Sequence, residues 1–127
     1  MAPAAAVTFV VVLTALAALQ AALAAGAPLG RFAFGGQHDG ALPAKLRVAS
    51  ALTILVYACM AVIVLDAAGL TDLLGEGFET VAIWVLVALL ALNIIPNAMS
   101  RSRPERLTMT PVLVILTACA LVVAVQQ

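Results

Sequence analysis

The chain has 127 residues, of which 65 % are hydrophobic and only 9 % are charged. Water-soluble domains are about 45–50 % apolar and about 25 % charged, so a folded chain of this composition has too little polar surface for water and must be solvated by lipid. Its formal net charge is zero, with six Lys and Arg in all, which excludes the basic surface that a nucleic-acid partner requires.

The first apolar run covers residues 4–25 and ends at Gly26. A helix needs about 20 apolar residues to cross a bilayer, so this run predicts a first membrane-spanning helix. Residues 7–19 also resemble the apolar core of a secretory signal peptide, and cleavage of such a peptide is the alternative. Signal peptides normally begin with Lys or Arg, whereas none precedes this run. We therefore expect the first helix to be retained.

Three further uncharged runs of similar length predict three more spans, at residues 48–65, 80–100 and 107–125. Backbone polar groups must be paired within the chain in lipid, and the alternation typical of barrel strands is absent, so these spans are expected to be helices. The predicted fold class is therefore all-α: a four-transmembrane-helix bundle of up-down-up-down topology, forming a single domain over residues 1–127.

Basic and acidic residues are concentrated in different segments between the predicted spans. All six Lys and Arg lie in segments 26–47 and 99–106, and four of the six acids lie in segment 66–79. In a four-span chain the first and third loops share one side of the membrane, and basic loops are retained in the cytoplasm. The pattern predicts a multi-pass protein of the cell membrane with loops one and three cytoplasmic and both termini outside.

Polar side chains gather near the expected cytoplasmic ends of the spans. Asn93 and Asn97 share a helix face at i, i+4, with Pro96 between them. One interpretation is that these groups only hydrogen-bond the helices to one another. The other is a polar pocket, open to the cytoplasm, for an anionic lipid headgroup or a small anion. The candidate residues of this layer are Gln20, Arg47, Ser50, Thr53, Asn93, Asn97, Arg101 and Arg103.

A second polar group is expected at mid-membrane. Counting along the spans places Thr14, Tyr57 and Thr117 at a similar depth. A tyrosine hydroxyl in hydrocarbon needs a partner, and such interhelical bonds are worth roughly 0.6–2 kcal/mol. We therefore expect Tyr57 to hydrogen-bond Thr14 or Thr117.

Ionisable residues, which usually support proton or ion transport in membrane proteins, are absent from the middle of the spans. No Asp, Glu, Lys, Arg or His lies deep within any of them, although such residues mark proton relays and ion-coupled pathways. Cys59 and Cys119 lie in apolar runs and lack the spacing of a metal site or a disulfide framework. We expect a protein that is not an enzyme and that has no catalytic residues, metal site or cofactor.

Two groups of residues resemble a known kind of protein. The first comprises Gly-Ala-Pro at 26–28, Gly-Arg at 30–31, Gly-Gly-Gln at 35–37, Leu-Pro at 42–43, Arg47 and Ser50; the second comprises Asn97, Ser-Arg-Ser at 100–102, Glu-Arg at 105–106 and Pro111. Together they resemble small four-span bacterial integral membrane proteins of unassigned function, an uncharacterised family. The resemblance implies the fold and the membrane location, and supplies no functional residues.

Two classes of function remain open. The favoured one is a non-enzymatic accessory protein that contacts membrane lipids or binds a partner, which is a second copy of the chain or another membrane protein. The alternative is a small oligomeric channel or transporter that uses the cytoplasm-facing polar layer, because hydroxyl and amide groups can line a pathway without ionised side chains.

Overall fold

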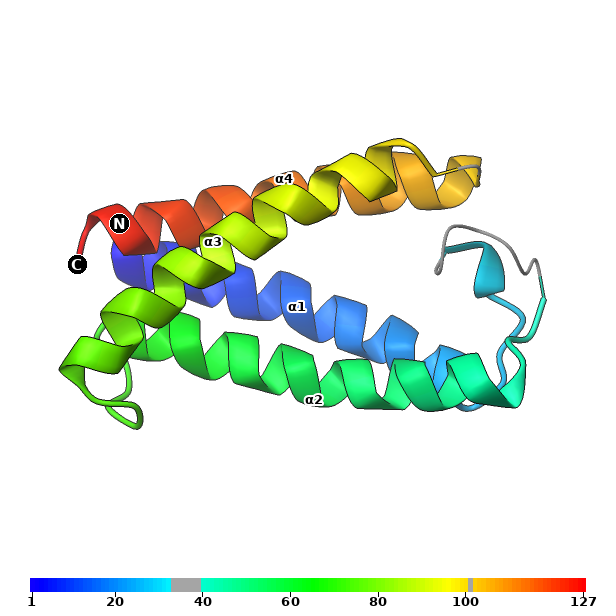
Figure 1. Cartoon of the computed structure of the whole chain (residues 1–127), viewed down its shortest axis with the longest axis horizontal. Helices are drawn as coiled ribbons and strands as arrows, with labels where there is room; N and C mark the ends of the chain where they lie inside the picture. Colours follow the sequence, from blue (N-terminus) through cyan, green and yellow to red (C-terminus); the bar gives the residue numbers. More distant parts are fainter. Residues whose placement is uncertain (33–39, 101) are drawn as a thin grey trace.

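The computed structural model describes residues 1–32, 40–100 and 102–127. In these ranges the chain forms four long helices and one short 3-10 turn, and neighbouring long helices run antiparallel (Figure 1). The predicted all-α four-helix bundle is confirmed. Its elements are α1 (Ala2–Ala24), η1 (Gly30–Phe32), α2 (Ala44–Ala67), α3 (Glu76–Ala98) and α4 (Arg103–Val125).

The bundle is built from two hairpins, α1–α2 and α3–α4. Helix α1 packs closely against both α2 and α4, and α3 packs mainly against α4, whereas α2 and α3 make few contacts. One end of the bundle holds both termini and the α2–α3 connection, and we call it the terminal end. The other end, which we call the loop end, holds the α1–α2 and α3–α4 connections. Figure 1 shows that the two hairpins are close at the terminal end and diverge towards the loop end.

The outer surface of the bundle is apolar along all four helices. A 23-residue helix such as α1 rises about 35 Å, enough to cross the hydrocarbon core of a bilayer. Each of the four helices is long and apolar enough to be a span, and the large apolar side chains on their outer faces have no protein neighbours to cover them. The chain is therefore a small four-span membrane protein. Examples of these exposed side chains are Val7, Val11, Leu52, Leu55, Val81, Leu89, Leu92, Val114 and Val125.

Two helices extend beyond their predicted spans into the basic segments. Helix α2 begins at Ala44 rather than residue 48, and α4 begins at Arg103 rather than residue 107. Hydropathy marks the lipid-buried part of a helix, whereas backbone hydrogen bonding continues through the headgroup region. Lys45 and Arg47 therefore lie on the first turn of α2, not in a loop.

Glycines end both helices of the first hairpin in the same way. Gly26 follows α1 with φ +97°, and Gly69 follows α2 with φ +80°, a backbone conformation that residues with a Cβ rarely adopt. The N–H of Ala27 donates to the Ala22 carbonyl at 2.9 Å, and that of Leu70 donates to the Leu65 carbonyl at 3.0 Å. These are Schellman turns, which pair the last carbonyls of each helix and turn the chain back.

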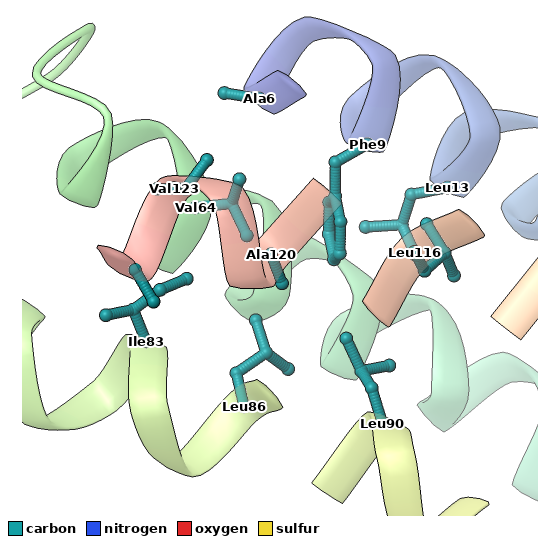
Figure 2. Close-up of a cluster of buried hydrophobic side chains, with 11 residues drawn as sticks. Ala6, Phe9, Leu13, Val64, Ile83, Leu86, Leu90, Leu116, Ala120 and Val123 are labelled. Carbon is teal, nitrogen blue, oxygen red and sulfur yellow. The ribbon is translucent and has the colours of Figure 1, made fainter. Parts of the chain in front are cut away.

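The apolar core lies in the half of the bundle nearer the terminal end (Figure 2). The ring of Phe9, on α1, points towards α4 between Ala120 and Leu116. Small side chains such as Ala6 and Ala120 let the helices approach closely here, as packing within a membrane requires. The core residues are Ala6, Phe9, Leu13, Val64, Ile83, Leu86, Leu90, Leu116, Ala120, Val123 and Ala124.

Candidate functional site

The inward face of every helix changes from apolar to polar towards the loop end. The positions that continue the core at three- and four-residue spacing are Gln20 on α1, Asn93 and Asn97 on α3, and Glu105 on α4. On α2 the same face carries Val64, then Met60, Tyr57, Thr53 and Ser50 in order. The core therefore ends in a polar layer at the level where the two hairpins separate.

A cavity of about 300 Å³ lies between the hairpins at this level. Its volume is at the lower end of the range for ligand pockets, about 300–1,000 Å³. All four helices and η1 contribute to its wall. The polar lining residues are Gln20, Thr53, Tyr57, Asn93, Asn97 and Glu105; the apolar ones are Leu16, Phe32, Val56, Met60, Leu90, Met109, Val112, Leu113 and Leu116.

Several polar groups of the wall use their donors within their own helix. The Thr53 hydroxyl donates to the Ala49 carbonyl at 2.8 Å. The Asn93 amide donates to the Leu89 carbonyl, and the Asn97 amide to the Asn93 carbonyl, both at 2.8 Å. These bonds hold the side chains against the helix. Each bond uses the hydroxyl proton of Thr53 or one of the two amide N–H groups of an asparagine, and the side-chain oxygens remain available as acceptors.

The hydroxyl groups of Thr14, Thr117 and Tyr57 were predicted to lie at mid-membrane, with Tyr57 bonded to one of the threonines. The Thr14 hydroxyl donates to the Val10 carbonyl at 2.8 Å, and that of Thr117 donates to the Leu113 carbonyl at 2.7 Å. Both threonines therefore donate within their own helices and not to Tyr57, and a bond that Tyr57 donates to one of them stays a prediction. The side chain of Gln20 is a hydrogen-bond partner of the Tyr57 hydroxyl. Gln20 Oε1 remains buried without a donor.

Among the residues of the cavity wall that the structure describes, Glu105 is the charged one. It lies in the first turn of α4, where its backbone N–H donates to Oγ of the N-cap residue Ser102 at 3.4 Å. Its side chain is only 6 % exposed, and Oε2 is buried without a hydrogen-bond partner. Our sequence analysis assigned this residue only to a basic loop. The sequence did indicate an inward position for Glu105, because this residue continues the helical spacing of the inward-facing residues Ala120, Leu116 and Met109.

The predicted layer residues separate into two groups. Gln20, Thr53, Asn93 and Asn97 lie together in the cavity wall, whereas Arg47, Ser50 and Arg103 are not part of it. Ser50 is fully buried with an unpartnered hydroxyl, and Arg103 is exposed. Arg101 lies outside the described residues. The anionic ligand stays a prediction, and the described wall supplies no cation for it.

Arg47 stabilises the end of α1 instead of bordering the cavity. Its Nε donates to the Ala24 carbonyl at 3.0 Å, which is one of the unpaired carbonyls at a helix C-terminus and carries partial negative charge. The guanidinium lies against Gly26, where an added Cβ would be 3.3 Å from Cζ. Arg106 acts similarly, with Nη1 donating to the Ser100 carbonyl at 3.3 Å.

A buried carboxylate at the terminal end was also missed. Asp66 is 2 % exposed, although the sequence placed it only among the acids of segment 66–79. Its Oδ2 accepts the N–H groups of Leu73 at 2.8 Å and Leu74 at 2.6 Å, and its Oδ1 accepts the Thr71 hydroxyl. Asp66 therefore organises the α2–α3 connection. In the described part of the chain, no three His, Cys, Asp or Glu residues are grouped as metal ligands.

No protein-family model matches the chain, and neither the curated proteins nor the solved structures include a match to it. The resemblance to small four-span membrane proteins thus leads to no family assignment, and the membrane-protein fold rests on the four helices themselves.

Proposed function

We propose that this protein binds a small amphipathic molecule in the cavity between its two hairpins and holds or carries it at the membrane. The observation that supports this best is the combination of a polar mouth with an apolar floor. Gln20, Asn97 and Glu105 lie towards the loop end, and Met60 and Leu116 lie towards the core. A molecule with a polar head and a short apolar body would match both parts.

The cavity supports binding rather than catalysis. Its described wall has one carboxyl group, Glu105, together with amide, hydroxyl and phenol groups. General acid–base or nucleophilic catalysis requires a second group beside the first, such as an activated nucleophile with its base. We therefore propose a non-enzymatic role without a cofactor.

We further propose that the cavity faces the cytoplasm. The described bases lie at the loop end, whereas Asp66, Asp72 and Glu79 lie near the terminal end. The excess of basic residues in short loops favours a cytoplasmic loop end. The bases concerned are Lys45, Arg47, Arg103 and Arg106.

A second candidate function is association with another membrane helix, in the accessory role that the sequence favours. Thr14, Ala18, Ala21 and Ala25 are all exposed and follow one face of α1 at four-, three- and four-residue spacing. Small residues on a lipid-facing helix allow a partner helix to approach closely. The partner would be a second copy of the chain or another membrane protein, within a bilayer whose lipids contact the remaining surface.

Native mass spectrometry of the protein released from nanodiscs tests both candidates, because it reports bound molecules and stoichiometry together. The nanodiscs are prepared directly from the expressing membrane. We expect the wild type to retain a small-molecule adduct, and Asn93→Phe to lose at least about nine-tenths of it because the new ring fills the cavity wall. Leu92→Phe is the matched control, since Leu92 is 63 % exposed to lipid and lies outside the cavity.

An adduct that survives Asn93→Phe would be bound elsewhere and would contradict the cavity proposal, as would a wild type that carries no adduct. A dimer without any adduct would favour the second candidate.

A further inference from the structure

We infer that the cavity selects an organic ammonium ion that carries N–H donors, with the Glu105 carboxylate as its counter-charge. This inference rests on the proposed ligand-binding function and specifies the chemistry of the ligand. It differs from the anion or anionic headgroup that the flanking arginines suggested.

The cavity wall contains buried acceptors that no donor among the described residues fills. Thr53, Asn93 and Asn97 donate to carbonyls of their own helices. Gln20 Oε1 and Glu105 Oε2 are buried and accept nothing. Buried acceptors without donors are costly, so a ligand that supplies donors is favoured over one that supplies further acceptors. A primary ammonium group supplies three N–H donors.

Among the basic side chains that the structure describes, none forms an ion pair with Glu105. Arg47 is occupied by the Ala24 carbonyl, and Arg106 donates to the Ser100 carbonyl. Arg103 is exposed. A carboxyl group that is nine-tenths buried and has an oxygen without a hydrogen-bond partner attracts a cation strongly, because the surrounding apolar groups screen the charge poorly.

The α4 side of the cavity wall changes from a carboxyl group to apolar side chains along the helix. Glu105 lies in the first turn of α4 at the mouth. Met109, Val112 and Leu116 follow it along the same wall, one turn after another, towards the core. A cation at Glu105 would therefore place its apolar body along α4. This arrangement suits an amine with a compact apolar group, and it does not suit a fully hydrated metal ion.

Equilibrium dialysis of the detergent-solubilised protein against empty micelles tests the inference with three probes of nearly equal size. Benzylammonium, benzyl alcohol and benzoate differ in the charge and donors of the polar group and share the apolar ring. We expect benzylammonium to bind most tightly and benzoate least. Glu105→Gln is expected to weaken benzylammonium on the order of tenfold or more, because a charge-assisted bond between two ions is lost, and to weaken the uncharged benzyl alcohol less.

Glu79→Gln is the matched control, since Glu79 lies on α3 at the opposite end of the bundle, and its affinities should equal those of the wild type. Equal binding of all three probes, abolished by Asn93→Phe, would overturn the selectivity and leave the proposed function intact. Tightest binding of benzoate would overturn the selectivity in favour of an anion site. If no probe binds, the ammonium site is refuted. The proposed function is then decided separately, by whether the protein released from nanodiscs retains an adduct that Asn93→Phe removes.

The ammonium group has two available sources, a free amine and the headgroup of an ethanolamine lipid. Native mass spectrometry from nanodiscs containing equal parts of phosphatidylethanolamine and phosphatidylglycerol separates them. If the wild type retains phosphatidylethanolamine selectively and Glu105→Gln retains less of it, the lipid headgroup is the source of the ammonium group. Benzylammonium binding without selective lipid retention would identify a free amine.

Discussion

Replacing Phe9 with alanine is expected to lower the free energy of unfolding by about 3–5 kcal/mol, the range for large aromatic side chains removed from a packed core. Phe9 has no exposed surface and lies where α1 meets α4, between Ala120 and Leu116 (Figure 2). Lipid cannot enter the resulting cavity from outside, so nothing restores the dispersion attraction that the ring supplied. Reversible unfolding in mixed detergent micelles measures the change.

Phe78→Ala provides the matched control for that experiment, because Phe78 on α3 is 62 % exposed. Detergent or lipid fills most of the space that the ring leaves there, and the expected decrease in stability is within about 0.5 kcal/mol. Equal decreases for the two variants would mean that α1 does not pack into the bundle as described.

Replacing Asp66 with alanine is expected to cost about 2–4 kcal/mol, because hydrogen bonds to a charged acceptor contribute roughly 1.5–3 kcal/mol each and water replaces part of the loss. The carboxylate accepts bonds from Thr71, Leu73 and Leu74. Their donors lose a buried acceptor together when the side chain is removed. The same unfolding assay applies.

Two further variants define the role of Asp66. Asp72→Ala removes an exposed acid from the same connection and should change the stability by less than about 0.5 kcal/mol. Asp66→Asn keeps one acceptor oxygen, so its free energy of unfolding should lie between those of Asp66→Ala and Asp72→Ala. If Asp66→Ala is as stable as the wild type, the carboxylate does not stabilise the α2–α3 connection.

The architecture could be predicted because lipid imposes simple rules on a sequence. Each span must be an apolar helix of nearly fixed length, and short connections force neighbouring helices to run antiparallel. These rules are sufficient to predict the first helix: the sequence places it at residues 4–25, and in the structure it spans Ala2–Ala24. They do not determine which helices touch, so the separation of α2 from α3 at the loop end could not be derived.

The cavity wall could be predicted only in part, because charge and polarity do not reveal the rotation of a helix. Gln20, Thr53, Asn93 and Asn97 were recognisable as polar groups within apolar runs. Glu105 was hidden by its three arginine neighbours in the segment 99–106, and its inward position follows from the packing of Ala120 and Leu116 against α1.

Arg47 and Asp66 show a second limit of sequence analysis. Both bind backbone groups, at the Ala24 carbonyl and at the N–H groups of Leu73 and Leu74. Every residue has such groups, so no side-chain pattern marks these partners. Only the course of the chain after Gly26 and Gly69 brings each charged side chain to its partner.

Thiol labelling tests most directly whether the cavity between the hairpins is hydrated and opens on the cytoplasmic side, as proposed above. In a chain with Cys59 and Cys119 replaced by alanine, single cysteines are introduced by Thr53→Cys in the cavity wall and by Leu52→Cys beside it on the lipid face. A membrane-impermeant methanethiosulfonate is applied to inverted vesicles and to intact cells. Reaction requires a hydrated thiolate, so the thiol at position 53 should react in inverted vesicles at least about ten times faster than that at position 52, and benzylammonium should slow it. Equal rates at the two positions, or reaction at position 53 only in intact cells, would contradict the account.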